Sequence, residues 1–132
     1  MLIHPADEIP IYRQIMRQIT EAIAVGRLSP GEKLPSHRDL SEQLVIAPLT
    51  VKKAYDELEL LGYLETQRGR GTFVCARLPK ADRAQQRVEV DESARKLLAQ
   101  AYLAGLSYPD VLEILERADR ALNAAPVEKE TL

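Results

Sequence analysis

The clearest chemistry in this 132-residue chain belongs to a basic tetrapeptide, Arg68-Gly69-Arg70-Gly71. Arginine carries a permanent charge and a planar fork of donors that suits phosphate oxygens. Glycine permits positive φ angles and lets another backbone approach closely. Such a segment can use glycine for its geometry alone, but two interleaved arginines favour contact with a nucleic-acid backbone.

Charge is sorted along the stretch from Leu49 to Leu61. Its polar positions begin with Thr50, Lys52 and Lys53 and end with the acids Asp56, Glu57 and Glu59. Phosphate oxygens repel acids, so only the first two turns of a helix here can lie deep in a nucleic-acid groove. Each lysine also stands four residues before an acid, the spacing of an intrahelical ion pair, which is a second explanation of the lysines. Such pairs are weak and do not prevent phosphate contact.

These side chains belong to a stretch, residues 34–74, that predicts two short helices, a tight turn and a two-stranded hairpin. Ser36 is the expected N-cap of the first helix, with Asp39 three residues later as in a capping box. Arg38 falls in the first turn, where it either approaches the DNA backbone or remains a solvated surface charge. The order of elements is that of a winged helix-turn-helix, which places one helix in the major groove of DNA.

Leu49–Leu61 is the expected recognition helix, and Val45–Pro48 is the turn before it. The apolar stripe of this helix, expected to face the core, comprises Val51, Ala54, Tyr55, Leu58 and Leu61. The hairpin strands are expected at Tyr63–Gln67 and Thr72–Ala76, with the basic tetrapeptide between them.

An amphipathic helix, Pro10–Val25, precedes this module and is expected to cover it. Its apolar stripe comprises Ile11, Ile15, Ile19 and Ile23, with Tyr12 and Met16 beside them. Its polar residues, Arg13, Gln14, Arg17, Gln18 and Glu21, are expected mostly to face away from the core. Residues 1–9 predict an extended lead-in, and residues 27–35 a turn-rich connector.

The remaining chain predicts a linker at 77–90, a helical hairpin at 91–124 and a flexible tail at 125–132. The polar linker is expected to be solvated, although its basic residues could also reach phosphates. So small a hairpin cannot bury its apolar faces alone, so it packs either against a second copy or against the module of its own chain. The expected dimer interface comprises Leu97, Leu98, Ala101, Val111, Leu112, Leu115, Ala118 and Leu122. The expected fold is mainly α with a small β-hairpin, with a DNA-binding domain over residues 1–76.

Three segments resemble the DNA-binding domain of GntR-family bacterial transcription regulators: PSHRDLSEQL at 35–44, TVKKAYDELELLGYL at 50–64 and RGRGTF at 68–73. The short helical appendage is similar to the C-terminal region of the YtrA-like subfamily. The resemblance implies a homodimeric regulator, most often a repressor, that binds an inverted-repeat operator in double-stranded DNA, commonly that of a transporter operon. It carries DNA contacts onto Arg38, Thr50, Lys52, Arg68 and Arg70, and the local pattern adds Ser36, Lys53 and Gly69.

The chain departs from the family pattern in the turn before the recognition helix. Val45 stands where the family usually has glycine, and a β-branched residue disfavours the left-handed conformation that glycine allows. Ala47 lacks a polar side chain that would cap the next helix. Leu49 replaces a polar residue, and it either packs into the core or meets a thymine methyl in the groove.

Total charge does not indicate DNA binding, because 18 basic and 20 acidic side chains leave a formal net charge of −2. Local placement of the basic residues would have to provide the attraction. The chain shows no long apolar run, no signal peptide and no cysteine pair, so we expect a cytoplasmic protein without a membrane partner.

An enzyme is the least favoured class, since His4 and His37 are isolated and Cys75 has no evident partner. We expect no metal site and no cofactor. Cys75 is either a buried strand residue or a redox sensor. The main alternative to a DNA-binding regulator is a winged-helix module that binds protein. A small-molecule effector, if one exists, would fit best at a dimer interface.

Overall fold

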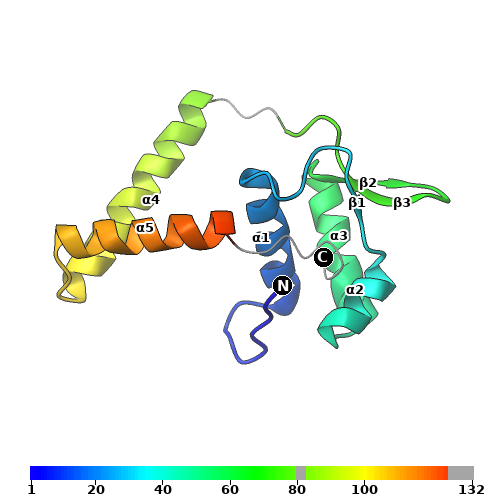
Figure 1. Ribbon diagram of the computed structural model, residues 1–132, viewed down its shortest axis with the longest axis horizontal. Coiled ribbons are helices and arrows are strands. Elements are labelled where there is room, and N and C mark those ends of the chain that lie inside the picture. The colour runs from blue at the N-terminus through cyan, green and yellow to red at the C-terminus, as the bar shows by residue number, and fades with distance from the viewer. Residues whose placement is uncertain (80–82, 125–132) are drawn as a thin grey trace. The chain divides into compact units, whose positions relative to one another are not determined.

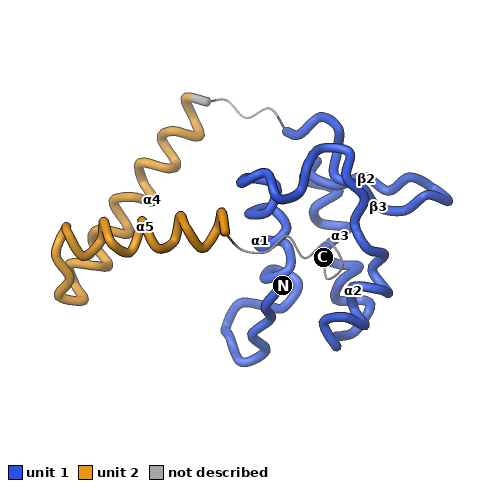
Figure 2. Tube along the Cα trace, viewed as in Figure 1, with its two compact units in different colours: residues 1–79, 126–132 blue, residues 80–125 orange. Residues whose placement is uncertain are grey.

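The computed structural model describes residues 1–79 and 83–124, a mainly helical chain with one small sheet (Figure 1). The chain divides into two compact units, one containing Met1–Pro79 and the other lying within Lys80–Ala125 (Figure 2). The mainly α fold class predicted from the sequence is confirmed. The tail expected at 125–132 lies outside the described residues. Within the described part, no helix is long and apolar enough to span a membrane.

The first unit is a winged helix-turn-helix. Its elements are α1 Ile11–Ala24, β1 Lys33–Leu34, α2 His37–Leu44, α3 Pro48–Leu60, β2 Leu64–Gln67 and β3 Gly71–Val74. The sheet is antiparallel with β3 in the middle, and Thr66 faces Thr72 across the hairpin. The sequence predicts only a connector where β1 lies. Its two residues become a strand by pairing with the distant β3, which no local pattern reveals.

The core of this unit is formed by the three helices and the sheet. Its buried apolar residues are Ile15, Ile19, Ala22, Leu28, Leu34, Leu40, Val51, Ala54, Tyr55, Leu58, Leu64 and Val74. Leu61, predicted to face inward, is instead 55% exposed. It lies just beyond the last turn of α3, where the chain reverses through Gly62 at φ 87°, so it no longer follows the helical stripe.

Gln14 is buried, although the sequence predicts it on the outer face of α1. Its side chain is 1% exposed. Its amide oxygen accepts the His4 N–H at 2.8 Å, and its amide nitrogen donates to the carbonyls of His4 and Ile9, both at 2.9 Å. A buried amide is tolerated when its polar atoms are paired in this way. Gln14 therefore fastens the lead-in, residues 1–9, to α1.

Gln18 makes a second and more exposed connection between α1 and the lead-in. Its side-chain oxygen accepts the Leu2 N–H at 3.0 Å, and its side-chain nitrogen donates to the Leu2 carbonyl. Because these bonds compete with water, they contribute less to stability than the buried ones of Gln14.

Tyr55 connects α3 to the segment before α2. Its hydroxyl donates to the Pro35 carbonyl oxygen at 2.8 Å, and its side chain is buried. Burial, with a smaller contribution from the charge of Asp39, raises the pKa of the Tyr55 phenol well above its ordinary value of 10.0. An acid whose pKa is raised on folding stabilises the protein below its unfolded pKa and loses that contribution as the pH rises above it.

We predict that Tyr55→Phe lowers the free energy of unfolding by about 1–2 kcal/mol at neutral pH, because the Pro35 carbonyl loses its donor. Wild type should then lose stability more steeply than the variant above about pH 10, where only wild type carries this phenol. Urea unfolding of both proteins at neutral and alkaline pH measures the two effects. The same dependence on alkaline pH in both proteins would contradict the assignment.

The second unit is a hairpin of α4, Arg83–Leu103, and α5, Tyr108–Ala124. Gly105 ends α4 at φ 82°, and the Leu106 N–H donates to the Ala101 carbonyl at 2.9 Å in a Schellman motif.

Ser107 and Asp110 cap α5 reciprocally. The Asp110 carboxylate accepts the Ser107 N–H at 2.7 Å and its hydroxyl at 2.9 Å, and the Asp110 N–H donates back to that hydroxyl at 3.3 Å. These bonds from the Ser107 backbone and side chain lower the pKa of the Asp110 carboxyl. The cap therefore favours the folded state at neutral pH and loses that contribution as acid protonates the carboxylate.

α4 begins earlier than predicted. Residues 83–90, expected within the linker at 77–90, form about two turns of helix. The segment 83–104 contains neither glycine nor proline, and its alanine, glutamine, glutamate and arginine residues favour helix. The described side chains from 84 to 96 are all exposed. The polar composition of this segment therefore belongs to a solvated helix and not to an extended linker.

Candidate nucleic-acid interface

α2 begins with the cap that the sequence predicts. The Ser36 hydroxyl oxygen accepts the Asp39 N–H at 3.1 Å. The hydrogen of that hydroxyl remains able to donate, so Ser36 can cap the helix and offer a donor to a phosphate oxygen at once. Arg38 follows in the first turn with an exposed side chain.

Val45 adopts the left-handed conformation between α2 and α3, with φ 55° and ψ 51°. It is the one non-glycine residue with positive φ among those described. Its N–H donates to the Glu42 carbonyl at 3.3 Å, and the Ile46 N–H donates to the Ser41 carbonyl at 3.0 Å. Glycine holds the same position after α3 and α4. The turn therefore has the geometry of a glycine-terminated helix, although Val45 takes the place of the glycine and is strained there.

We predict that Val45→Gly raises the free energy of unfolding by about 1 kcal/mol, because the left-handed conformation is costly for a residue with a Cβ. Val45 is 87% exposed, so the change removes little packing. Thermal unfolding measures the gain, and Val45→Ala, which keeps a Cβ, is the matched control. A glycine variant no more stable than the alanine variant would contradict the assignment of strain.

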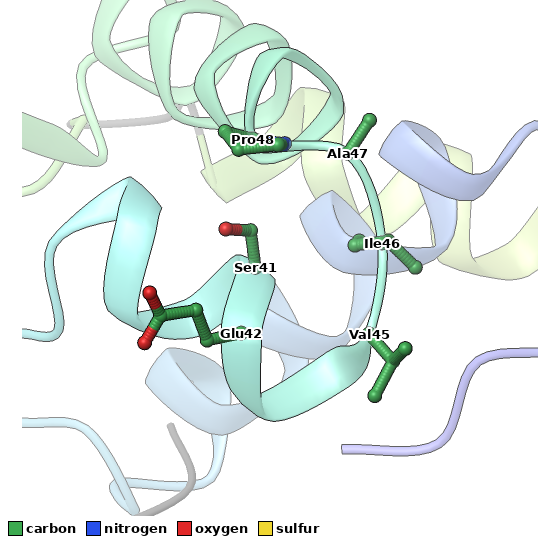
Figure 3. Close-up of a pocket in the computed structure, with 6 residues that line it drawn as sticks. All are labelled: Ser41, Glu42, Val45, Ile46, Ala47 and Pro48. Atoms are coloured by element: carbon green, nitrogen blue, oxygen red, sulfur yellow. The ribbon is translucent and has the colours of Figure 1, made fainter.

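The start of α3 is apolar and exposed. Ala47 occupies the N-cap without a side-chain hydrogen bond, and Pro48 takes the first helical position. Leu49 is 77% exposed, which excludes the predicted alternative that it packs into the core. The turn residues line an open hollow between α2 and α3, from which Val45 and Ala47 extend outward (Figure 3). Thr50, the next residue, is half-buried.

The two lysines of α3 have different partners. Lys52 Nζ lies 2.8 Å from an Asp56 carboxylate oxygen, which confirms the predicted intrahelical pair. Both side chains are about half exposed, so this pair contributes little and can open. Lys53 Nζ instead lies 4.2 Å from the centre of the Tyr12 ring on α1, a cation–π contact that the sequence did not suggest. Lys53 would have to leave that ring to reach DNA.

The wing, residues 64–74, carries its basic tip at Arg68, Gly69 and Arg70, all of them exposed. The tip is a turn in which the Arg70 N–H donates to the Gln67 carbonyl at 2.9 Å and Gly69 takes φ 77°. Gly71 has φ 125°, a conformation that favours glycine, and a Cβ built there would lie 2.9 Å from Cε of Lys33, a flexible side chain that could move aside.

Lys33 is a basic residue of this surface that sequence reasoning missed. It is exposed, and its Nζ lies 3.6 Å from where a Gly71 Cβ would be, so its charge lies beside the wing. The local sequence does not indicate that Lys33 lies beside the wing, because β1 reaches the wing through the long-range pairing of Lys33 with Phe73.

Glu59 attaches the wing to α3. Its carboxylate accepts the Thr66 N–H at 3.1 Å and the Thr66 hydroxyl at 3.4 Å. The sequence assigns this acid only to a helix surface. These two bonds show that Glu59, an acid in the second half of α3, holds β2 against the helix.

Cys75 has little of the character of a redox sensor. It is partly buried, and burial followed by the charges of Glu65 and Glu59 raises the pKa of its thiol. A raised pKa reduces the thiolate, which is the reactive form. Within residues 1–79 and 83–124 no group of three or more histidine, cysteine or acidic side chains could hold a metal ion.

Comparison with known proteins agrees with this geometry. The family model described as bacterial regulatory proteins, gntR family, matches residues 11–74. The HTH-type transcriptional repressor YtrA of Bacillus subtilis is 38% identical over 104 residues, which cover 79% of this chain and 80% of that protein.

Solved structures give the same result. A transcriptional antiterminator from Listeria monocytogenes EGD-e aligns with a TM-score of 0.76 and 26% identity over 93% of this chain and 92% of its own. AraR(DBD), solved in complex with operator ORX1, aligns with a TM-score of 0.51 and 31% identity over 57% of this chain and 93% of its own.

Proposed function

Because the chain belongs to the gntR family of bacterial regulatory proteins, we propose that two copies of it bind one operator and repress the adjacent genes. The family resemblance seen in the sequence is confirmed, and the chain is a DNA-binding transcriptional regulator of the YtrA-like type. Our proposal adds the homodimer, an inverted-repeat operator and, following the YtrA-like resemblance, a transporter operon as the target. The relatives found are transcriptional regulators, which favours this proposal over a winged-helix module that binds only protein.

The observation that carries the proposed DNA contact is an exposed basic wing beside a helix whose first two turns contain no acid. We propose that Arg38, Arg68 and Arg70 contact phosphates, with Ser36 and Gly69 supporting them and Lys33 adding charge. Thr50 and Lys52 lie at the start of α3, the part of a recognition helix that contacts base edges. AraR(DBD), which was solved with an operator, supports this use of the domain.

The proposed dimer rests on the α4–α5 hairpin. Leu112 and Leu115, on α5, are 44% and 45% exposed. Neighbouring apolar side chains left this exposed in a small helical hairpin can mark a surface that another chain covers. Ala101 and Val111, predicted in the interface, are buried within a single chain and so need no second copy. The proposed interface therefore comprises Leu97, Leu98, Leu112, Leu115, Ala118 and Leu122. An effector, if the protein has one, would fit between the two copies.

Selection of bound duplexes from a random pool, at a stated salt concentration, tests the proposal. We expect an enriched inverted repeat and a complex of two chains per duplex by analytical ultracentrifugation. Leu112→Glu together with Leu115→Glu should give a folded monomer, because buried carboxylates cannot be paired at the interface. Enrichment of a single half-site bound by one chain would overturn the dimer, and no salt-sensitive enrichment would overturn operator binding itself.

A further inference from the structure

The beginning of the recognition helix presents an apolar rim to solvent, which we define as Val45, Ala47 and Leu49. Val45 is 87% exposed, Leu49 is 77% exposed and Ala47 is exposed beside them. Exposed apolar side chains that lie together as one patch can mark a contact site, whereas isolated ones are common on protein surfaces. The rim is therefore a candidate contact surface.

The rim takes no part in the core of its own unit. α3 packs inward through Val51, Ala54, Tyr55 and Leu58, all of them buried. The turn hydrogen bonds of Val45 and Ile46 to Glu42 and Ser41 hold the backbone of the rim in place. The backbone of the rim is therefore held in place, and its apolar side chains are accessible. These properties suit it to a van der Waals contact with another molecule.

The chemistry of the major groove limits what such a rim can recognise there. Base edges present hydrogen-bond donors and acceptors, and the C5 methyl of thymine is their apolar group. None of the three side chains of the rim can donate or accept a hydrogen bond. We infer that Leu49, supported by Val45 and Ala47, recognises thymine methyl groups in each half-site. This inference rests on the proposed function, because it requires that α3 lies in the major groove.

The neighbours of the rim favour DNA over a protein partner as its occupant. Arg38 and Lys52, both exposed basic residues, lie on α2 and α3, the helices that the rim joins. The acids Asp56 and Glu59 follow only in the later turns of α3. Glu42, an exposed acid on α2, lines the hollow beside the rim, whereas the first two turns of α3 carry Lys52 and Lys53 and no acid. An apolar rim with cations along α3 matches the methyl groups and phosphates of a groove.

Thymine-to-uracil substitution in a duplex tests the inference, because it removes only the methyl group. Starting from the duplex selected from a random pool, each thymine of one half-site is replaced in turn, and fluorescence anisotropy gives the Kd. We expect at least one position at which uracil weakens wild-type binding about fourfold, the effect of removing one buried carbon. For Leu49→Ala, the same substitution should change the Kd less than about 1.5-fold at that position.

Leu60→Ala is the matched control, because Leu60 is 82% exposed at the other end of α3 and outside the rim. It should keep the wild-type response to uracil. A selected duplex that wild type binds equally well with uracil at every position would overturn the inference and leave operator binding intact. A uracil effect that persists in Leu49→Ala would also overturn it. Failure to enrich any duplex would overturn both, and would leave the rim to a protein partner.

Discussion

Arg68→Ala together with Arg70→Ala should weaken binding to every duplex by about 100-fold at roughly 0.1 M salt. Two charge-assisted contacts to phosphate are lost, and at the low end of about 1.5 kcal/mol each they amount to about 3 kcal/mol, slightly more than 100-fold in affinity. The loss should be similar for the selected operator and for unrelated DNA, because phosphates carry no sequence information.

The salt dependence of binding distinguishes this loss from a change of shape in the wing. Each phosphate contact contributes about 0.9 to the slope of log K against log salt, so the double variant should have a slope about 2 units shallower. Titrations at four or five salt concentrations measure it. A weakened complex with an unchanged slope would mean that the arginines act through the conformation of the wing.

Arg117→Ala together with Arg120→Ala is the control for net charge. Both residues are exposed on α5, outside the winged helix, and their replacement removes the same two charges. We expect this variant to bind within about threefold of wild type, since our proposal gives these two arginines no contact with phosphate. An equal loss in both double variants would show that total charge matters and that the wing has no special role.

Local chemistry in the sequence predicted the architecture of the DNA-binding unit. Helix caps are determined by residues three positions apart, which is why the Ser36 cap of α2 was found from the sequence. The ion pair of Lys52 with Asp56 followed in the same way from one turn of helix. The charge sorting along α3 required only the period of a helix.

Contacts between distant segments could not be predicted in this way. Lys33 reaches the wing through a strand that exists only because β3 pairs with it, and Lys53 lies on a tyrosine of another helix. Val45 shows a different limit. Its β-branched side chain argued against a left-handed residue, but the hydrogen bonds of the turn outweigh that preference.

Gln14→Leu should lower the free energy of unfolding by about 2–3 kcal/mol, because the three hydrogen bonds of a buried amide are lost while the volume is kept. The Gln14 amide bonds to His4 and Ile9, so the variant leaves one N–H and two carbonyls of the lead-in without these partners. For a unit of this size we expect a fall of roughly 10 °C or more in Tm. Differential scanning calorimetry measures it, and hydrogen exchange at the His4 amide should quicken with it.

Gln18→Leu separates the effect of burial from the effect of losing a glutamine. Gln18 lies on the same helix and also bonds to the lead-in, through Leu2, but its bonds are exposed to water. Water can replace them, so we expect a cost of no more than about 1 kcal/mol. If both variants were equally destabilised, burial would not be the source of the Gln14 contribution. If neither were destabilised, the lead-in would not be part of the cooperative fold. The expected inequality would make burial of the amide of Gln14, a residue outside the recognition surface, the main source of the attachment of the lead-in to α1.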